Sequence, residues 1–246
     1  MSELAGKRAL VTGASRGIGA GIARALADKG ADVAITYDRS ADQAAQVVRA
    51  IESQGRRAVA IQADSGDPAA VKRAVDEAAA WLGGLDILVN NAGIARAGAV
   101  AEISLADIDA LLNVNVRGVV LATQAAIPHL PAGGRIISIG STLAERVPFG
   151  GSTIYAMTKS ALLAFTRGLA HEVGPRGITV NLVQPGSIDT DMNPAAGDQA
   201  EGLRALTALG RYGTTDEIGA AVAFLASPAA GLMTGSMVTV DAGFSA

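Results

Sequence analysis

Hydrophobic and polar positions along the chain fall into two kinds of stretch that alternate from one end to the other. Short β-branched apolar runs predict buried strands, and longer alanine-rich stretches between them predict helices, two of which end at Gly30 and Gly55. The predicted strands cover residues 8–12, 31–37, 58–62, 85–90, 135–139, 178–183 and 238–240, and the predicted helices cover residues 17–29, 40–54, 68–82, 104–130 and 155–174.

This alternation predicts a single α/β domain. Strands separated by helices form βαβ units, which assemble into a parallel sheet. No proline- or serine-rich linker interrupts the repeat, so residues 1–246 are expected to form one doubly wound domain. We expect seven parallel strands in the order 3-2-1-4-5-6-7, with helices on both faces. The least regular part runs from Pro185 to Gly202, and residues from about 190 to 212 are a candidate substrate lid.

Composition narrows the possible partners. Hydrophobic residues make up 50% of the 246-residue chain and charged residues 17%, which is enough for a buried core, and 3% aromatics make that core mostly aliphatic. The net charge of −3 argues against a nucleic-acid partner. The absence of cysteine excludes disulfides, and two histidines are too few for a typical metal site. No signal-like start and no apolar run near the ~20 residues of a membrane span were found, so we expect a soluble, cytoplasmic protein.

The first predicted strand runs into a glycine-rich turn that opens a helix. Gly13, Gly17 and Gly19 lie in this turn. Glycine permits positive φ and lets the backbone approach a ligand closely, and a helix N-terminus attracts a pyrophosphate. A glycine turn alone often only reverses the chain, but the order strand, glycines, helix is the context that dinucleotide binding requires.

The end of the second predicted strand bears on which dinucleotide binds. NAD sites usually carry an acid there for the ribose 2′-hydroxyl, whereas this chain has Tyr37, followed by Asp38, Arg39 and Ser40. Arg16, inside the glycine turn, offers a planar fork for a 2′-phosphate. We therefore expect NADP(H) to be favoured over NAD(H). The alternatives are that both arginines are solvated surface charges, and that an inward Asp38 repels the phosphate.

Tyr155 and Lys159 are the first candidates for catalysis. Their spacing places them on one face of a helix, and Ser141 lies fourteen residues upstream of the tyrosine. A nearby cation favours the phenolate and lowers the pKa of a tyrosine from its usual ~10. The pair therefore suggests an acid–base catalyst, although such pairs on helices are more often surface contacts.

Short motifs recur along the chain beside these two stretches. They are TGxxxGIG at 12–19, NNAG at 90–93, Asn115 in NVNV, YxxxK at 155–159, PGSIDT at 185–190, and the C-terminal pair TG at 234–235 and VDAG at 240–243. Together these motifs resemble the short-chain dehydrogenase/reductase family. The resemblance covers the whole chain, its motifs stand in the family's order, and it is closest to 3-oxoacyl-(acyl-carrier-protein) reductases and related ketone reductases. It implies a Rossmann fold.

The resemblance implies a catalytic set of Asn115, Ser141, Tyr155 and Lys159. Tyr155 would protonate the substrate carbonyl oxygen, and Ser141 would hydrogen-bond the same oxygen. Lys159 would hold the nicotinamide ribose and lower the tyrosine pKa, while Asn115 would fix a kink in a long helix and a water that relays protons. Thr142 could compete with Ser141, which is favoured because it directly follows its strand.

The resemblance also implies the residues that hold the cofactor. Asp64 would contact the adenine, although a helix N-cap is an equally good explanation for it. Asn90 and Gly93 would line the central ribose. The full implied set is Gly13, Ser15, Arg16, Gly17, Ile18, Gly19, Tyr37, Arg39, Ser40, Asp64, Asn91, Ala92, Gly93, Tyr155, Lys159, Pro185, Gly186, Ile188 and Thr190.

The expected activity is the NADPH-dependent reduction of a ketone or 3-oxoacyl thioester to the alcohol. The alternatives are an NAD-dependent alcohol dehydrogenase of the same family and a nucleotide-binding regulatory protein on this fold. An epimerase or dehydratase would need a larger C-terminal region. A carrier-protein partner would favour a basic patch, for which Arg96 and Arg146 are candidates, and Phe149 and Met192 are candidates for the substrate wall. The resemblance implies a homotetramer.

Overall fold

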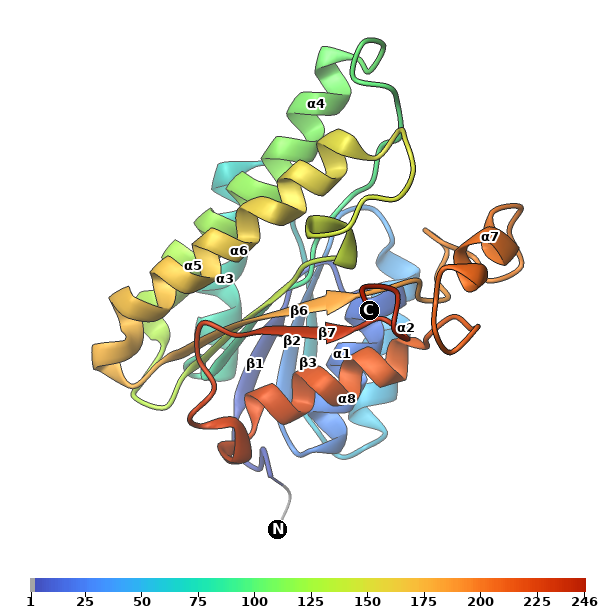
Figure 1. The fold of residues 1–246 in the computed structure, drawn as a ribbon. Coiled ribbons are helices and arrows are strands. Elements are labelled where there is room, and N and C mark those ends of the chain that lie inside the picture. Colours follow the sequence, from blue (N-terminus) through green and yellow to red (C-terminus); the bar gives the residue numbers. More distant parts are fainter. Residues whose placement is uncertain (1–2) are drawn as a thin grey trace.

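A parallel sheet of seven strands forms the centre of the protein (Figure 1). The computed structural model describes residues 3–246, and all neighbouring strands pair in parallel in the order β3-β2-β1-β4-β5-β6-β7. The predicted α/β architecture and strand order are therefore confirmed. The strands are β1 (Arg8–Val11), β2 (Asp32–Tyr37), β3 (Ala58–Gln62), β4 (Ile87–Asn90), β5 (Arg135–Ile139), β6 (Thr179–Pro185) and β7 (Met237–Val240).

Helices cover both faces of this sheet, and each face has its own hydrophobic core. Strands β4, β5 and β6 are buried along their whole length, because a doubly covered parallel sheet has no solvent face. The cores are built of Ala, Val, Leu and Ile. One face carries α1 (Gly17–Asp28), α2 (Ala41–Glu52) and α8 (Thr215–Ala226), and the other carries α3 (Pro68–Leu82), α5 (Val119–Ala126) and α6 (Thr153–Val173).

Helix α8 was not predicted from the sequence. It begins with a capping box: the Thr214 hydroxyl accepts a hydrogen bond from the Glu217 amide at 3.2 Å, and the Glu217 carboxylate accepts one from the Thr214 amide at 2.8 Å. Arg211 and these hydrogen bonds hold the pKa of Glu217 at about 2. A threonine followed three residues later by a glutamate is a readable helix start.

The predicted helix over 104–130 is one helical run with an irregular centre. It comprises α4 (Leu105–Leu112), a π-helical segment (Asn113–Gly118), α5 and a short 3₁₀ turn (Ile127–His129). By length and composition the 25 residues Leu105–His129 could cross a membrane, which corrects the expectation that no stretch is long enough. The core helix of a soluble protein passes the same test, and α5 packs here against α3 in the hydrophobic core.

The candidate lid is partly helical. After β6, residues 190–199 run in turns, and α7 (Ala200–Ala205) follows. In Figure 1 this excursion, which carries α7, lies at the right-hand side of the molecule. It rejoins the body where Ile188 bridges to Gly213. Whether this segment acts as a lid stays a prediction.

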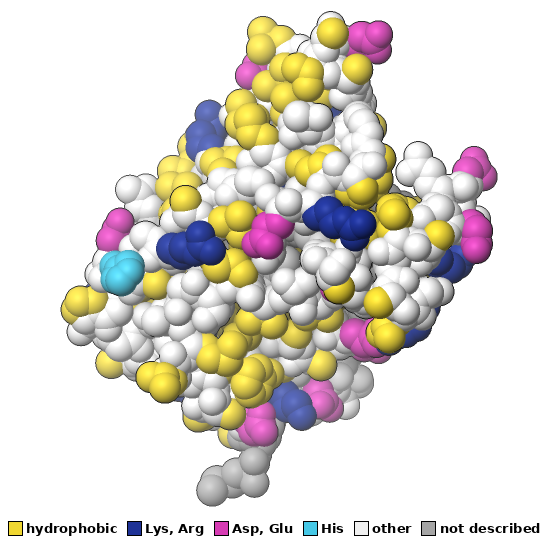
Figure 2. All heavy atoms as spheres, viewed as in Figure 1, with side chains coloured by type: hydrophobic (Ala, Val, Ile, Leu, Met, Phe, Trp, Pro, Cys, Tyr) yellow, Lys and Arg dark blue, Asp and Glu magenta, His cyan; other side chains and the backbone are white. Residues whose placement is uncertain are grey.

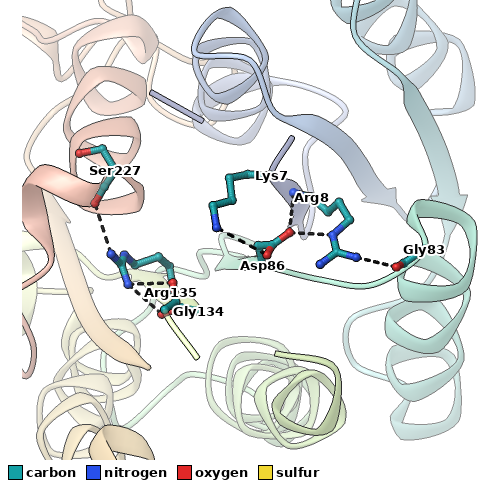
Figure 3. Close-up of polar contacts among 8 residues, drawn as sticks. Lys7, Arg8, Gly83, Asp86, Gly134, Arg135 and Ser227 are labelled. Carbon is teal, nitrogen blue, oxygen red and sulfur yellow. Dashed lines mark hydrogen bonds and ion pairs between the residues drawn. The ribbon is translucent and has the colours of Figure 1, made fainter. Parts of the chain in front are cut away.

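The amino-terminal edge of the sheet is closed by polar contacts (Figure 3). The buried carboxylate of Asp86 accepts from Arg8 Nε at 2.7 Å, and Lys7 Nζ lies 3.8 Å from it. Arg135 donates to the carbonyl oxygens of Gly134 and Ser227, and burial lowers the pKa of its guanidinium. Because this edge is closed, a ligand site is expected at the opposite, carboxyl edge.

Candidate active site

The glycine turn after β1 is fixed by its surroundings. Gly13 and Gly17 have φ of +62° and +56°, a region that favours glycine. A Cβ on Gly19 would lie 2.4 Å from Asn91 Nδ2, so no side chain fits there. Asn91 Nδ2 donates to the carbonyl oxygens of Thr12 and Gly13 at 2.9 and 3.0 Å. The turn is therefore shaped by the loop after β4.

Thr12 also binds the loop after β4, and it was not among the predicted site residues. Its hydroxyl accepts hydrogen bonds from the amides of Asn91 and Ala92, both at 3.0 Å. A Cβ on Gly13 would lie 2.8 Å from Ala92 Cα, so the two backbones are in close contact. The two predicted cofactor segments, 12–19 and 91–93, thus form one rigid wall.

Asn90 does not belong to this wall, which corrects the expectation that it lines the central ribose. Its side chain is 2% exposed and turns into the core. Asn90 Nδ2 donates to Thr123 Oγ1 at 2.9 Å and to Ser138 Oγ at 3.4 Å. Successive residues of a strand point to opposite faces, so Asn90 and Asn91 separate into core and site.

The first two helices begin without a side-chain cap at this edge. Arg16 and Ser40 occupy the N-cap positions of α1 and α2, and neither side chain bonds the first-turn amides. By contrast, Asp67 and Thr214 cap α3 and α8. Uncapped first turns offer free N–H groups and the positive end of a helix dipole. These residues therefore fit two phosphate groups.

A groove of about 330 Å³ adjoins the glycine turn. The start of the candidate lid lies against the glycine turn, because a Cβ on Gly17 would lie 3.5 Å from Thr190 Cγ2. The Thr190 hydroxyl accepts a hydrogen bond from the Asn193 amide at 3.3 Å, and the Ile188 side chain is buried in the core. The groove is lined by Ser15, Arg16, Gly17, Ala20, Arg24, Gln43, Gln46, Val47, Asp189, Thr190, Asp191 and Thr215.

The arginines predicted to read a 2′-phosphate are both paired with acids. Arg16 Nη1 lies 3.2 Å from Asp191 Oδ2, and Arg39 Nε lies 3.0 Å from Asp38 Oδ2. Both pairs are exposed, so each is worth only about 0.2–1 kcal/mol. Arg39 therefore offsets the charge of Asp38, the residue that argued for NAD, while Asp191 competes for Arg16. Tyr37 ends β2 beside them.

The structure rejects the helix-cap explanation for Asp64. Helix α3 is capped by Asp67, which accepts from the amides of Ala69 and Ala70 at 2.8 and 3.4 Å. Asp64 Oδ1 instead accepts from the Gly66 amide at 2.8 Å in the preceding loop. Its exposed carboxylate follows β3 and remains a candidate for the adenine.

Ser141 and Tyr155 meet beyond the end of β5. Ser141 caps a 3₁₀ turn by accepting from the Leu143 amide at 3.2 Å, and Tyr155 lies in the first turn of α6. Burial raises the pKa of Tyr155, and a hydrogen bond with Ser141 partly offsets this. The expectation that Lys159 lowers this pKa is not met in the protein alone, where its ammonium lies 5.9 Å from the phenol ring centre.

Lys159 is a buried cation. Its side chain is 5% exposed, and burial lowers its pKa from 10.5 to about 8. Its Nζ donates to the Ile139 carbonyl at 2.9 Å, one of the three bonds that an ammonium can donate. A Cβ on Gly93 would lie 3.4 Å from this nitrogen, so the lysine faces the 91–93 wall. Its remaining donors suit the hydroxyls of a ribose.

Thr142 is hydrogen-bonded to the backbone at the end of β6. Its hydroxyl donates to the Pro185 carbonyl at 3.3 Å and the residue is 4% exposed. Ser141, not Thr142, is the hydroxyl that lowers the pKa of Tyr155, against the larger effect of burial. Pro185 and Gly186 close this side, because a Cβ on Gly186 would lie 2.7 Å from Asp241 Cα. The geometry therefore favours Ser141 as the hydroxyl donor.

Asn115 stands in the π-helical segment and is fully buried. Its amide exchanges two hydrogen bonds with the backbone of Ile94, both at 2.9 Å, and donates a third to Thr158 Oγ1 at 3.1 Å. The predicted kink is thus a π-bulge, a feature frequent at functional sites. Thr158 is a further site residue that sequence reasoning missed.

The two arginines suggested for a carrier protein are engaged elsewhere. Arg96 pairs with Asp107 at 3.1 Å. Arg146 donates to the Phe244 carbonyl and lies 5.1 Å from the centre of its ring. The exposed side chains in the neighbouring loops, Phe149 and Met192, are apolar. The structure therefore gives this mouth no free basic patch from these residues.

The arrangement has known counterparts. Residues 13–245 match the family model described as enoyl-(acyl carrier protein) reductase. The chain belongs to the short-chain dehydrogenase/reductase family. A solved short-chain dehydrogenase from Burkholderia cenocepacia in complex with NADP is 59% identical, covers 99% of this chain and 100% of its own, and superposes with a TM-score of 0.98. The family's members are oxidoreductases.

Two curated members of the family differ in their stated roles. The cyclic-di-GMP-binding biofilm dispersal mediator protein of Escherichia coli is 44% identical over 246 residues, with 100% of both chains covered. Versicolorin reductase stcU of Emericella nidulans is 40% identical over 254 residues, covering 98% of this chain and 96% of its own. The comparisons therefore show the family, within which these two relatives have different stated roles.

Proposed function

We propose that this chain is an NADPH-dependent carbonyl reductase that converts a small ketone to its alcohol. One observation carries the proposal: the buried ammonium of Lys159 lies 5.9 Å from the ring centre of Tyr155, one helical turn away on α6, and the hydroxyl of Ser141 acts on the pKa of the phenol. A purely structural role does not explain a buried lysine whose ammonium has a single carbonyl partner among the hydrogen bonds of residues 3–246.

The chain's own groups would divide the work as follows. A bound nicotinamide supplies the hydride. Tyr155 holds the proton that the carbonyl oxygen acquires, and Ser141 hydrogen-bonds the same oxygen, which orients the carbonyl. Lys159 holds the nicotinamide ribose with its free N–H groups. Its positive charge, together with that of the cofactor, counters the desolvation that raises the pKa of Tyr155.

The cofactor is proposed to be NADP(H), and two observations support this. The uncapped first turns of α1 and α2 fit a pyrophosphate and a 2′-phosphate, with Arg16, Arg39 and Ser40 beside them. The Burkholderia relative was solved with NADP. An NAD-dependent alcohol dehydrogenase is the alternative, and the ratio of kcat/KM for NADPH to that for NADH decides between them.

The substrate is proposed to be a small apolar ketone rather than a carrier-protein thioester. Arg96 and Arg146, the candidates for binding an acidic carrier, are held within the protein, and Phe149 and Met192 are apolar. A screen of NADPH oxidation over diketones, aromatic ketones, acetoacetyl thioesters and sugars tests this. Turnover of aromatic ketones or diketones is expected, and turnover of thioesters alone would contradict the substrate class.

A regulatory nucleotide-binding protein is the second candidate, because the Escherichia coli relative is named for binding cyclic di-GMP. A single assay distinguishes the two candidate functions. A reductase oxidises NADPH when a ketone is added, whereas a sensor binds nucleotide without turnover. The complete Ser141, Tyr155 and Lys159 set favours the reductase. We also propose a cytoplasmic location for the protein.

The Arg16–Asp191 pair yields a prediction about cofactor affinity. Arg16→Ala removes a charged donor to the 2′-phosphate and is expected to weaken NADPH binding about tenfold, or ~1.4 kcal/mol. Asp191→Asn frees Arg16 and is expected to tighten NADPH two- to fivefold, as an exposed pair allows. Neither variant should change the Kd of NADH, measured by fluorescence titration. Arg49→Ala, on the last turn of α2, is the control. Equal effects on both cofactors would rule out a phosphate contact.

We also propose that the chain forms a homotetramer. Apolar side chains are exposed along α4, α5 and α6, including Leu105, Val120 and Met157, and Figure 2 shows hydrophobic atoms gathered over α4. Phe224 and Leu232 are exposed on α8 and in the segment before β7. Light scattering should give four times the 24.6 kDa chain mass. Val120→Glu should lower that mass, and a monomer for the unchanged protein would refute the proposal.

A further inference from the structure

Thr158 stands between two residues of the catalytic set. It lies in α6 between Tyr155 and Lys159, and its side chain is 1% exposed. Its hydroxyl donates to the Tyr155 carbonyl at 2.7 Å and accepts from Asn115 Nδ2 at 3.1 Å. A hydroxyl has one proton, so these two bonds have fixed directions: Asn115 donates to Thr158, and Thr158 donates to Tyr155.

The amide of Asn115 has no proton left for a substrate. Its two N–H groups go to the Ile94 carbonyl and to Thr158, and its oxygen accepts from the Ile94 amide. Through Ile94 it holds the loop that contains Gly93, whose Cβ position lies 3.4 Å from Lys159 Nζ and 3.5 Å from Asn115 Oδ1. Asn115 therefore connects the loop on one side of Lys159 to α6 on the other side. Its hydrogen-bond partner on α6 is Thr158.

We propose that Thr158 is a positioning residue for the reduction. Its hydroxyl fixes the amide of Asn115 against the first turn of α6, and this sets where the Tyr155 phenol lies relative to Lys159 and the 91–93 wall. The inference rests on the proposed reductase function. Catalysis depends steeply on such placement, because a misplacement of about 1 Å far from the chemistry can cost about 100-fold in rate.

Thr158→Val tests the role, since valine keeps the shape and the β-branching of threonine but has no hydroxyl. The variant leaves a buried N–H of Asn115 without its acceptor and releases the Tyr155 carbonyl. We expect kcat to fall about tenfold, while KM for the ketone and Kd for NADPH stay within about twofold of the wild type. Thr158→Ser keeps the hydroxyl and is expected to retain kcat within about twofold.

The chain offers a matched control at Thr123 in α5. Thr123 is also 1% exposed and also accepts a hydrogen bond from a buried asparagine, at 2.9 Å from Asn90 Nδ2. Thr123→Val therefore makes the same chemical change at the same burial, but outside the catalytic set. We expect it to lower Tm about as much as Thr158→Val does, with kcat within about twofold of the wild type.

The measured kcat and Tm values distinguish a positioning role of Thr158 from a purely structural one. If Thr158→Val lowers Tm like Thr123→Val but keeps kcat, Thr158 is only structural and the inference is wrong. The inference is also wrong if Thr158→Ser lowers kcat as much as Thr158→Val does. It is wrong as well if the control variant Thr123→Val lowers kcat as much as Thr158→Val does. Should the valine variant fail to fold, Thr158→Ala removes the same hydroxyl and is judged by the same criteria. If the wild type reduces no ketone, the proposed function falls first and the positioning role falls with it.

Discussion

Tyr155→Phe is expected to lower kcat about 1,000-fold while NADPH binds with nearly unchanged affinity. The phenol is the group that holds the proton for the carbonyl oxygen, and general acid catalysis contributes about 10²–10⁴-fold in enzymes. The aromatic ring, which packs beside Ser141 at the start of α6, is retained in phenylalanine. The loss should therefore appear in the chemical step alone.

Two measurements check this expectation. Turnover is followed by NADPH oxidation with a ketone that the wild type reduces, and binding by fluorescence titration of NADPH. Ser141→Ala is the companion variant, and it should lose about 100-fold in kcat because one donor to the developing oxyanion is removed. If Tyr155→Phe loses cofactor affinity and kcat together, the tyrosine is a structural residue and its assignment as the acid is wrong.

Lys159→Met is expected to lower kcat at least 100-fold and at the same time to change how stability depends on pH. Burial shifts the lysine pKa from 10.5 in the unfolded chain to about 8 in the folded protein. Between these values the folded state binds fewer protons than the unfolded state, so wild-type stability rises with pH. Below pH 8 the desolvation cost of the charged lysine is fully present, and above pH 10.5 it is gone.

The comparison with the variant isolates this effect. Methionine has no titrating group, so the free energy of unfolding of the wild type minus that of Lys159→Met should increase by about 2 kcal/mol from pH 7 to pH 9.5. Urea unfolding at the two pH values measures it. Lys72→Met, on the exposed surface of α3, is the control for turnover. A difference that is flat or that falls with pH would contradict the buried, destabilised ammonium.

The strands of the sheet could be predicted from the sequence because complete burial requires apolar residues along the whole strand. Strands such as β5 and β6 are covered on both faces, so they appear as continuous apolar runs. Their order follows from the resemblance and from the βαβ repeat. Helix α8 was missed although Thr214 and Glu217 mark its start, and its residues, 215–226, were assigned to no element.

The site was predicted less completely, and the gaps have a common cause. Ser141, Tyr155 and Lys159 stand in local motifs, so spacing places them. The orientation of a side chain depends instead on partners far away in sequence. Asn90 turns to Thr123, thirty-three residues on, and Thr158 meets Asn115 across forty-three. Local spacing cannot reveal these contacts, which is why Asn90 was placed wrongly and Thr158 was overlooked.

The reaction proposed for this site is the transfer of hydride from NADPH to a carbonyl carbon. The most direct measurement supplies NADPH carrying two deuterium atoms at nicotinamide C4, with a ketone that is turned over, and analyses the alcohol by mass spectrometry and NMR. With the wild type we expect one deuterium on the carbinol carbon of each alcohol molecule formed, and with Tyr155→Phe we expect almost no alcohol in the same time. Oxidised cofactor with unlabelled alcohol, or no alcohol from any ketone, would contradict it.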